Sequence, residues 1–218
     1  MIDLHTHSIF SDGELLPSEL VRRGLIHGYT AIAITDHMDA SNIDLVIPRI
    51  VKVAEGLRGK WDIEVIPGAE ITHVPPSLIG ELVKEARVLG ARLVVLHGET
   101  IVEPVAPGTN RAGINAGVDI IAHPGMIAEE DVVLAKAKGI YLEITARKGH
   151  CLCNGHIAAM AKKIGVGVVI NTDAHSPDDL ITKERAREIL TGSGLSDDLV
   201  EAVFNNANQL IERIRRGT

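Results

Sequence analysis

Short hydrophobic runs rich in Val, Ile and Leu recur along the chain and alternate with longer amphipathic segments. Runs of this length and composition predict β-strands that are buried on both faces. The seven predicted strands cover residues 2–5, 30–35, 63–66, 92–96, 118–122, 140–144 and 166–171. The chain therefore alternates between strand and helix over most of its length.

The segments between and after these strands have the spacing of amphipathic helices. In the first of them, Leu20, Val21 and Leu25 fall on one face, and a proline stands near the start, where a helix tolerates it. The predicted helices cover residues 17–28, 43–57, 76–90, 110–116, 128–138, 157–164, 183–190 and 199–214. Glycines that favour a left-handed helix end mark five of the boundaries: Gly28, Gly90, Gly117, Gly139 and Gly165.

This alternation predicts an α/β fold with a parallel sheet, either open or closed into a barrel. The last two helices are not followed by a strand. No linker, low-complexity tract or internal repeat interrupts the pattern. We therefore expect a single domain over residues 1–218.

The composition agrees with this fold class. Apolar residues make up 45% of the chain and charged residues 23%, as in soluble globular proteins. Aromatic residues make up only 2%, so the core must be built from aliphatic side chains. The formal net charge of −7 argues against a stable nucleic-acid binder, because such proteins rely on an excess of Lys and Arg.

Cysteine content and the N-terminal sequence bear on the cellular compartment. Cys151 and Cys153 are the only cysteines, so a disulfide framework is excluded. The N-terminus lacks the pattern of a signal peptide, and no apolar stretch approaches the roughly 18 residues of a membrane span. We expect a cytoplasmic protein with no membrane partner.

Histidines and acidic residues gather at the C-terminal ends of the predicted strands. The histidines are His5, His7, His37, His97, His123 and His175, and the acids are Asp12, Asp36, Glu70, Glu143 and Asp173. Active sites of parallel β/α barrels lie at the C-terminal mouth. If the sheet closes, these side chains therefore converge at one mouth, whereas an open sheet would spread them along an edge.

Imidazole and carboxylate are the ligands that suit Zn, Mn and Fe. His5 and His7 lie on one side of an extended strand, and Asp173 and His175 repeat that spacing. A carboxylate such as Glu70 can bridge two ions roughly 3.5–4 Å apart. A lone buried histidine is more often a hydrogen-bonded core residue, but the whole set predicts a metal centre, because unpaired carboxylates at this density would repel one another.

The remaining histidines carry weaker signals. His27 falls in the last turn of a predicted helix, where its cationic form complements the helix dipole, so we interpret it as structural. His73, three residues after Glu70, is a candidate for contacting and orienting a metal ligand without binding the ion itself. The stretch 150–156 holds two Cys and two His, which suits a zinc site by composition. Its Cys spacing instead favours a loop that lines the mouth, where His150 or His156 contacts substrate.

Several short motifs occur in a fixed order across almost the whole chain. They are HTH (5–7), SDG (11–13), TDH (35–37), PGAE (67–70), LH (96–97), AHPG (122–125) and NTDAH (171–175). Together they resemble the PHP family, named for polymerases and histidinol phosphatases. The resemblance implies a distorted seven-stranded β/α barrel of parallel strands, with a three-metal site at the C-terminal mouth.

The resemblance also implies a ligand set. One ion would be held by His5, His7, Glu70 and Asp173, a second by Glu70, His97 and His123, and a third by Asp12, His37 and His175. Some family members have a histidine at the station of Asp12, which affects the metal preference or occupancy of the third site. We therefore expect two or three divalent ions, with Glu70, Asp173 and His175 as catalytic residues.

The first functional hypothesis is hydrolysis of a phosphate monoester by a metal-activated hydroxide, with histidinol phosphate or another small phosphorylated metabolite or nucleotide as substrate. Arg111, Arg147 and Lys148 lie in predicted mouth loops, where they either clamp the phosphate or are solvated charges.

A second hypothesis is a phosphodiesterase or exonuclease acting on small nucleotides or oligonucleotides, although a long strand lacks an aromatic stacking face here. A third is a non-catalytic module that uses its metals only for folding or as part of a larger assembly. The oligomeric state stays open.

Overall fold

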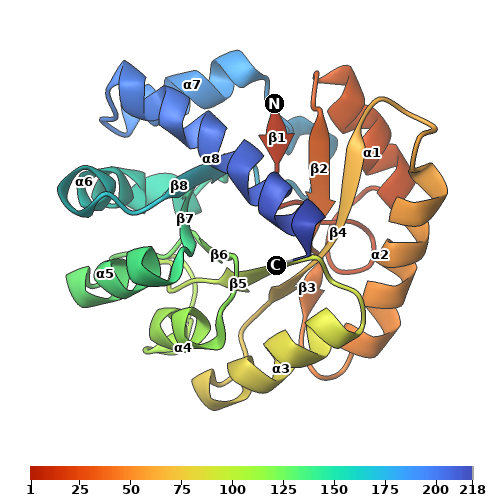
Figure 1. Cartoon of the computed structure of the whole chain (residues 1–218), viewed down its shortest axis with the longest axis horizontal. Helices are drawn as coiled ribbons and strands as arrows, with labels where there is room; N and C mark the ends of the chain where they lie inside the picture. The colour runs from red at the N-terminus through yellow and green to blue at the C-terminus, as the bar shows by residue number, and fades with distance from the viewer. Residues whose placement is uncertain (218) are drawn as a thin grey trace.

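The computed structural model of the protein describes residues 1–217, and its strands form a nearly closed parallel barrel (Figure 1). The strands are β1 (Ile2–Asp3), β2 (Ala31–Ile34), β3 (His37–Met38), β4 (Glu64–Ile71), β5 (Leu93–His97), β6 (Ile120–Ala122), β7 (Tyr141–Thr145) and β8 (Val168–Asn171). Seven of them follow the order β1-β2-β4-β5-β6-β7-β8, and the short β3 pairs with β4. The predicted seven-stranded α/β barrel is confirmed. A single domain over 1–218 stays a prediction, and residue 218 lies outside the described residues.

The strand predicted at residues 30–35 is β2, and after an interruption at residues 35 and 36 the chain forms the short strand β3, which the sequence did not predict. β2 pairs with the first half of β4, and β3 pairs with the second half, where His37 is opposite Glu70. Asp36 lies in the interruption, and its carboxylate accepts hydrogen bonds from the backbone and hydroxyl groups of Ser8 and Ser11. The break therefore places His37 beside Glu70 at the barrel mouth, while Asp36 anchors the loop that carries Asp12.

The helices match the sequence pattern closely. They are α1 (Pro17–Ile26), α2 (Ile43–Leu57), α3 (Pro76–Val88), α4 (Thr109–Ala116), α5 (Glu129–Lys138), α6 (Asn154–Ile164), α7 (Lys183–Gly192) and α8 (Asp197–Arg216). The five glycines predicted at helix ends all have positive φ, between 66° and 107°. Helices α1 to α6 cover the outside of the barrel, with aliphatic side chains between helices and strands. Within residues 1–217, no helix combines the length and apolar character needed to cross a membrane.

Helix α8 crosses one end of the barrel, in front of the strands in Figure 1. Its buried face packs against side chains that point into the barrel, among them Leu4, Ile66 and Val95. Asn206 donates a hydrogen bond to the carbonyl of Val168, the first residue of β8, so α8 lies at the N-terminal end of the strands. It therefore closes the end opposite the mouth. The sequence predicted this helix but not its position.

The α8 seal generates a prediction about stability. Leu210 is fully buried on the barrel side of α8, so Leu210→Ala should lower the free energy of unfolding by about 2–5 kcal/mol, through lost burial and the cavity left behind. Gln209 is exposed on the same helix, so Gln209→Ala is the matched control. Urea unfolding followed by circular dichroism measures both, and equal stability of the two variants would contradict the packing of α8.

Candidate metal centre

The barrel closes where the segment after β1 meets the segment after β8. Thr6 and Ala174 form a parallel bridge between the two segments. The backbone N–H of Asp173 donates to the carbonyl of His5, and the N–H of His7 donates to the carbonyl of Ala174, each at 2.9 Å. Because of this pairing, the imidazoles and carboxylates of residues 5–7 and 173–175 lie side by side.

The nine predicted ligands converge at this mouth in overlapping groups. In the described part of the chain, four groups made up of predicted ligands alone have ligand atoms close enough to share an ion: His5 with His7 and Glu70, His5 with His123 and Asp173, Glu70 with His97 and His123, and His7 with Asp12, His37 and His175. Within one group, His5 Nε2 lies 3.2 Å from Glu70 Oε1, and between two of the groups His7 Nε2 lies 3.1 Å from Asp173 Oδ1. Ligands about 2.0–2.1 Å from one tetrahedral ion are themselves roughly 3.3 Å apart, so these separations suit a shared cation.

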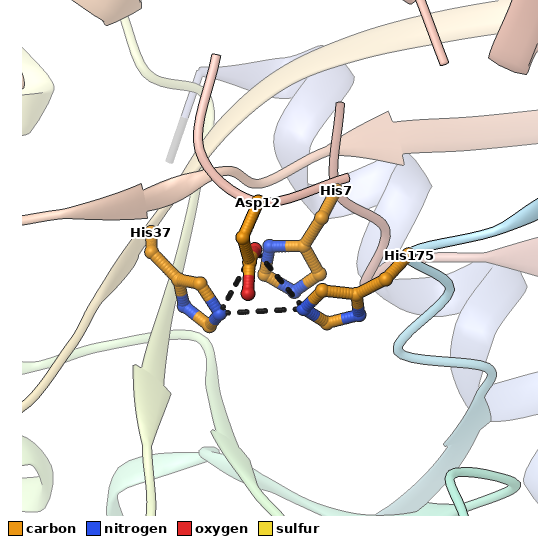
Figure 2. A group of neighbouring side chains, drawn as sticks. All are labelled: His7, Asp12, His37 and His175. Atoms are coloured by element: carbon orange, nitrogen blue, oxygen red, sulfur yellow. Dashed lines mark hydrogen bonds and ion pairs between the residues drawn. The ribbon is translucent and has the colours of Figure 1, made fainter. Parts of the chain in front are cut away.

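Figure 2 shows the group formed by His7, Asp12, His37 and His175, whose side chains point toward one another. Asp12 Oδ1 lies 3.2 Å from His175 Nε2 and 3.5 Å from His37 Nε2. The two imidazole nitrogens are 3.4 Å apart. Asp12 arrives from the loop that Asp36 anchors, His37 from β3 and His175 from the segment after β8, so three distant parts of the chain build this group.

Buried polar atoms test whether these residues fit a metal ion. Six side-chain nitrogen and oxygen atoms are buried without a hydrogen-bond partner in the described chain: His5 Nε2, both ring nitrogens of His7, Glu70 Oε1, His97 Nδ1 and His123 Nδ1. Leaving such an atom unpaired costs about 1–3 kcal/mol. All six belong to predicted ligands, and His5 Nε2 and Glu70 Oε1 face each other. A coordinated cation would satisfy one ring nitrogen of an imidazole or a carboxylate oxygen such as Glu70 Oε1, so the donor set fits divalent ions.

Burial and neighbouring charges set the protonation of the mouth. Burial, reinforced by neighbouring imidazoles, holds the pKa of His7 and of His123 well below the usual range, so both rings are neutral and can coordinate. Burial alone would raise the pKa of Glu70, but His5 and His37 outweigh it and hold that pKa well below normal. Burial raises the pKa of Asp173 to about 7. Uptake of a cation at Asp173 near neutral pH therefore competes with a proton.

The carboxylate of Glu143 contacts two of the predicted ligands and orients them. Its Oε1 lies 2.9 Å from His5 Nδ1, and its Oε2 accepts a hydrogen bond from the backbone N–H of His123 at 3.0 Å. Asn171 donates to Oε1 at 2.8 Å. A carboxylate on Nδ1 fixes the tautomer that leaves Nε2 free to bind an ion. The sequence located Glu143 at the end of a strand but did not reveal this positioning role.

Backbone strain is concentrated at the same mouth. Among residues 1–217, three non-glycine residues have positive φ: His73 at 53°, His123 at 26° and Asp173 at 53°. This conformation is unfavourable for residues other than glycine and persists where the surroundings enforce it, often at functional sites. Two of the three are predicted ligands, and the third lies beside His97, with the two ring centroids 4.7 Å apart.

The three basic residues expected to bind phosphate occupy different places. Arg147 lines a cavity of about 290 Å³ together with five of the predicted ligand side chains and Thr72, His73, Glu103 and His150. Arg147 and Lys148 both line an adjoining cavity of about 940 Å³. Arg111, on α4, is ion-paired with Asp131 and is not among the residues that line either cavity. The structure therefore brings only Arg147 to the metal mouth.

The four histidines outside the predicted ligand set also occupy different places. His27 caps the C-terminus of α1, as its interpretation requires. His73 and His150 both line the cavity at the mouth. His156 instead donates a hydrogen bond from Nε2 to the backbone carbonyl of Ile127 at 2.9 Å. Residues 150–153 form a 3₁₀ turn leading into α6, and neither cysteine joins a group of potential metal ligands among the described residues.

The sequence matches one family model and several known proteins over most of its length. The model of the PHP domain matches residues 3–146. An uncharacterized protein of Methanocaldococcus jannaschii is 46% identical over 97% of this chain and 99% of its own length. A protein of Thermoanaerobacter sp. named as a probable phosphatase is 27% identical over 92% of this chain and 89% of its own length.

A solved structure extends the comparison to the fold. A chain in the cryo-EM structure of archaeal ribonuclease P with mature tRNA superimposes with a TM-score of 0.75, at 16% identity, over 98% of this chain and 91% of that chain. At this identity the likeness concerns the barrel alone. The same architecture thus extends over nearly the full length of both chains.

The contacts of Glu143 generate a prediction about metal retention. Glu143→Gln should weaken metal retention by about 10–100-fold, because a neutral amide holds His5 less firmly in the required tautomer. Metal content after dialysis against a chelator, measured by mass spectrometry, gives the result, and circular dichroism verifies folding. Glu130 is exposed on α5, so Glu130→Gln is the control. A folded Glu143→Gln protein with unchanged metal retention would contradict the positioning role.

Proposed function

The chain belongs to the PHP domain family, and on that premise we propose that it hydrolyses small phosphate monoesters with the help of two or three divalent ions. Family membership and relatives named as phosphatases support a metal-dependent phosphoesterase. The proposal adds the substrate class and the ions, for which the imidazole and carboxylate donors favour Zn, Mn or Fe.

One observation carries this proposal: buried imidazole and carboxylate atoms without hydrogen-bond partners face one another at a mouth that opens into a cavity. Divalent ions at such a site lower the pKa of water toward neutrality and offset the negative charge of a phosphate. A protein that only needed stability would gain nothing from these unpaired groups, because each one costs free energy.

We assign the ions as the overlapping groups suggest. The first takes His5, His7, Glu70 and Asp173, the second takes Glu70, His97 and His123, and the third takes Asp12, His37 and His175. Glu70 lies close to ligands of both the first and the second ion: its Oε1 is 3.2 Å from His5 Nε2 and 3.9 Å from His123 Nε2. Its Oε2 lies 2.6 Å from His37 Nδ1, so the carboxylate is central to the whole cluster.

Arg147 is the residue that we assign to phosphate. Its guanidinium lies 3.1 Å from Asp179 and is part-exposed, and it lines both the mouth cavity and the larger one beside it. A guanidinium fork suits two phosphate oxygens. A phosphate bound by Arg147 would lie beside the residues that would hold the ions, and the rest of a small substrate would occupy the larger cavity, where Leu152 and Ile189 provide apolar contacts. The net charge of −7 favours such a substrate over a long nucleic acid.

Removal of the central carboxylate tests the proposal. Glu70→Ala should abolish turnover of p-nitrophenyl phosphate in the presence of Mn²⁺, because it removes a ligand shared between ions. His27→Ala is the control, since His27 lies at the end of α1, and its turnover should equal that of the unmodified protein. Circular dichroism checks that both variants fold.

Three outcomes would contradict the proposed function. Substantial turnover by a folded Glu70→Ala protein would contradict the central place of that carboxylate. No turnover of a panel of phosphomonoesters by the metal-loaded protein would favour the non-catalytic interpretation. Faster turnover of small phosphodiesters or oligonucleotides than of monoesters would replace the substrate class with the second hypothesis.

Arg147 generates a separate prediction for substrate binding. Arg147→Ala should raise KM for a phosphomonoester by about tenfold or more, because a hydrogen bond to a charged group contributes roughly 1.5–3 kcal/mol. Arg111→Ala removes the same charge away from the mouth and should leave KM unchanged. Steady-state kinetics of both variants decides the matter, and a larger effect at Arg111 would reverse the assignment.

A further inference from the structure

Glu103 extends from the loop between β5 and α4 into the metal mouth. Its Oε2 lies 2.9 Å from His73 Nε2 and 3.2 Å from His97 Nε2, and its Oε1 lies 3.3 Å from His150 Nε2. One carboxylate is thus surrounded by three imidazoles, one of which is a predicted ligand. Glu103, His73 and His150 were not part of the ligand set implied by the family resemblance.

The loop that carries Glu103 is braced at its base. Glu99 Oε1 accepts hydrogen bonds from the backbone N–H groups of Gly108 and Asn110, at 3.1 and 2.8 Å. Asn110 Oδ1 in turn accepts from the N–H of Glu99 at 3.1 Å. These reciprocal contacts fix the two ends of the loop against the start of α4. The position of Glu103 over the mouth is therefore supported by the fold rather than by its own contacts alone.

His97 links Glu103 to the proposed metal centre. It is 3% exposed, and it belongs both to the group with Glu70 and His123 and to a second group with His73 and Glu103. Its Nε2 faces Glu103, whereas its Nδ1 is buried without a partner. Coordination through Nε2 requires that nitrogen to carry no proton. Its lone pair would then face a carboxylate oxygen at 3.2 Å, which is repulsive unless both atoms share a cation.

We propose that Glu103 is a further metal ligand, which binds the same ion as Nε2 of His97. The separation of 3.2 Å matches that of neighbouring ligands around one ion, roughly 3.3 Å for bonds of 2.0–2.1 Å. His73 and His150 position the carboxylate from either side. This inference rests on the metal centre of the proposed function and adds a carboxylate to its second ion.

The backbone of His73 agrees with this arrangement. Its φ of 53° places it with His123 and Asp173, the other two non-glycine residues of the described chain in this unfavourable conformation. The loop after β4 thus holds His73 toward the mouth at a conformational cost. A solvated surface histidine would not need such a backbone.

The experiment compares Glu103→Gln and Glu103→Ala with the unmodified full-length protein. Gln keeps an oxygen that accepts a hydrogen bond from an imidazole but is a much weaker metal ligand than a carboxylate. Glu81→Gln on the exposed face of α3 is the control. Zn²⁺ affinity is measured by competition with a chelating dye, with stoichiometry from mass spectrometry. Visible absorption of the Co²⁺-loaded proteins reports on coordination independently of activity.

If Glu103 is a ligand, both Glu103 variants should bind one ion about tenfold or more weakly, and both should change the Co²⁺ spectrum, whereas Glu81→Gln should not. A Glu103→Gln protein with the affinity and spectrum of the unmodified protein would overturn the inference and reduce Glu103 to a hydrogen-bond acceptor. Metal binding by the unmodified protein would in that case leave the proposed function standing. Failure of the unmodified protein to bind any of these metals would overturn both.

Discussion

The parallel pairing of the segments that follow β1 and β8 is the interaction on which the site depends. Thr6 and Ala174 are 168 positions apart in the sequence, yet their bridge completes the barrel. The pairing sets His5 and His7 against Asp173 and His175 through backbone hydrogen bonds. Because backbone geometry fixes the register, the positions of the ligands do not depend on flexible side chains. The remaining strands add Glu70, His97 and His123 to a mouth that is already defined.

The two ends of the barrel differ in the side chains that fill them. At the N-terminal end, aliphatic side chains of α8 pack against the aliphatic side chains inside the barrel. At the C-terminal end, imidazoles and carboxylates are buried although several of their atoms have no hydrogen-bond partner. Burial of such groups is costly unless they are paired or bind metal. The apolar seal at one end and the polar pocket at the other explain how a small domain can support an unfavourable cluster of this density.

Around the cluster, a second set of side chains orients the first. Glu143 holds His5 and the backbone at His123, Asp36 anchors the loop of Asp12, and Thr72 contacts His37 at 2.8 Å. The structure also separates three basic residues that looked equivalent in the sequence. Arg147 reaches the mouth, whereas Arg111 is ion-paired with Asp131 on the next helix. Only this separation gives the proposed phosphate a specific contact.

The sequence by itself determined the alternation of strands and helices, the parallel barrel and the strand ends at which the ligands would stand. These features follow from local periodicity and residue type, so they can be read without knowing which segments touch. Only the tertiary structure decided that α8 seals the opposite end, that Asp36 anchors a loop instead of joining the ligands, and that Glu103 reaches His97. Each of these depends on contacts between segments far apart in the chain, and no local pattern encodes them.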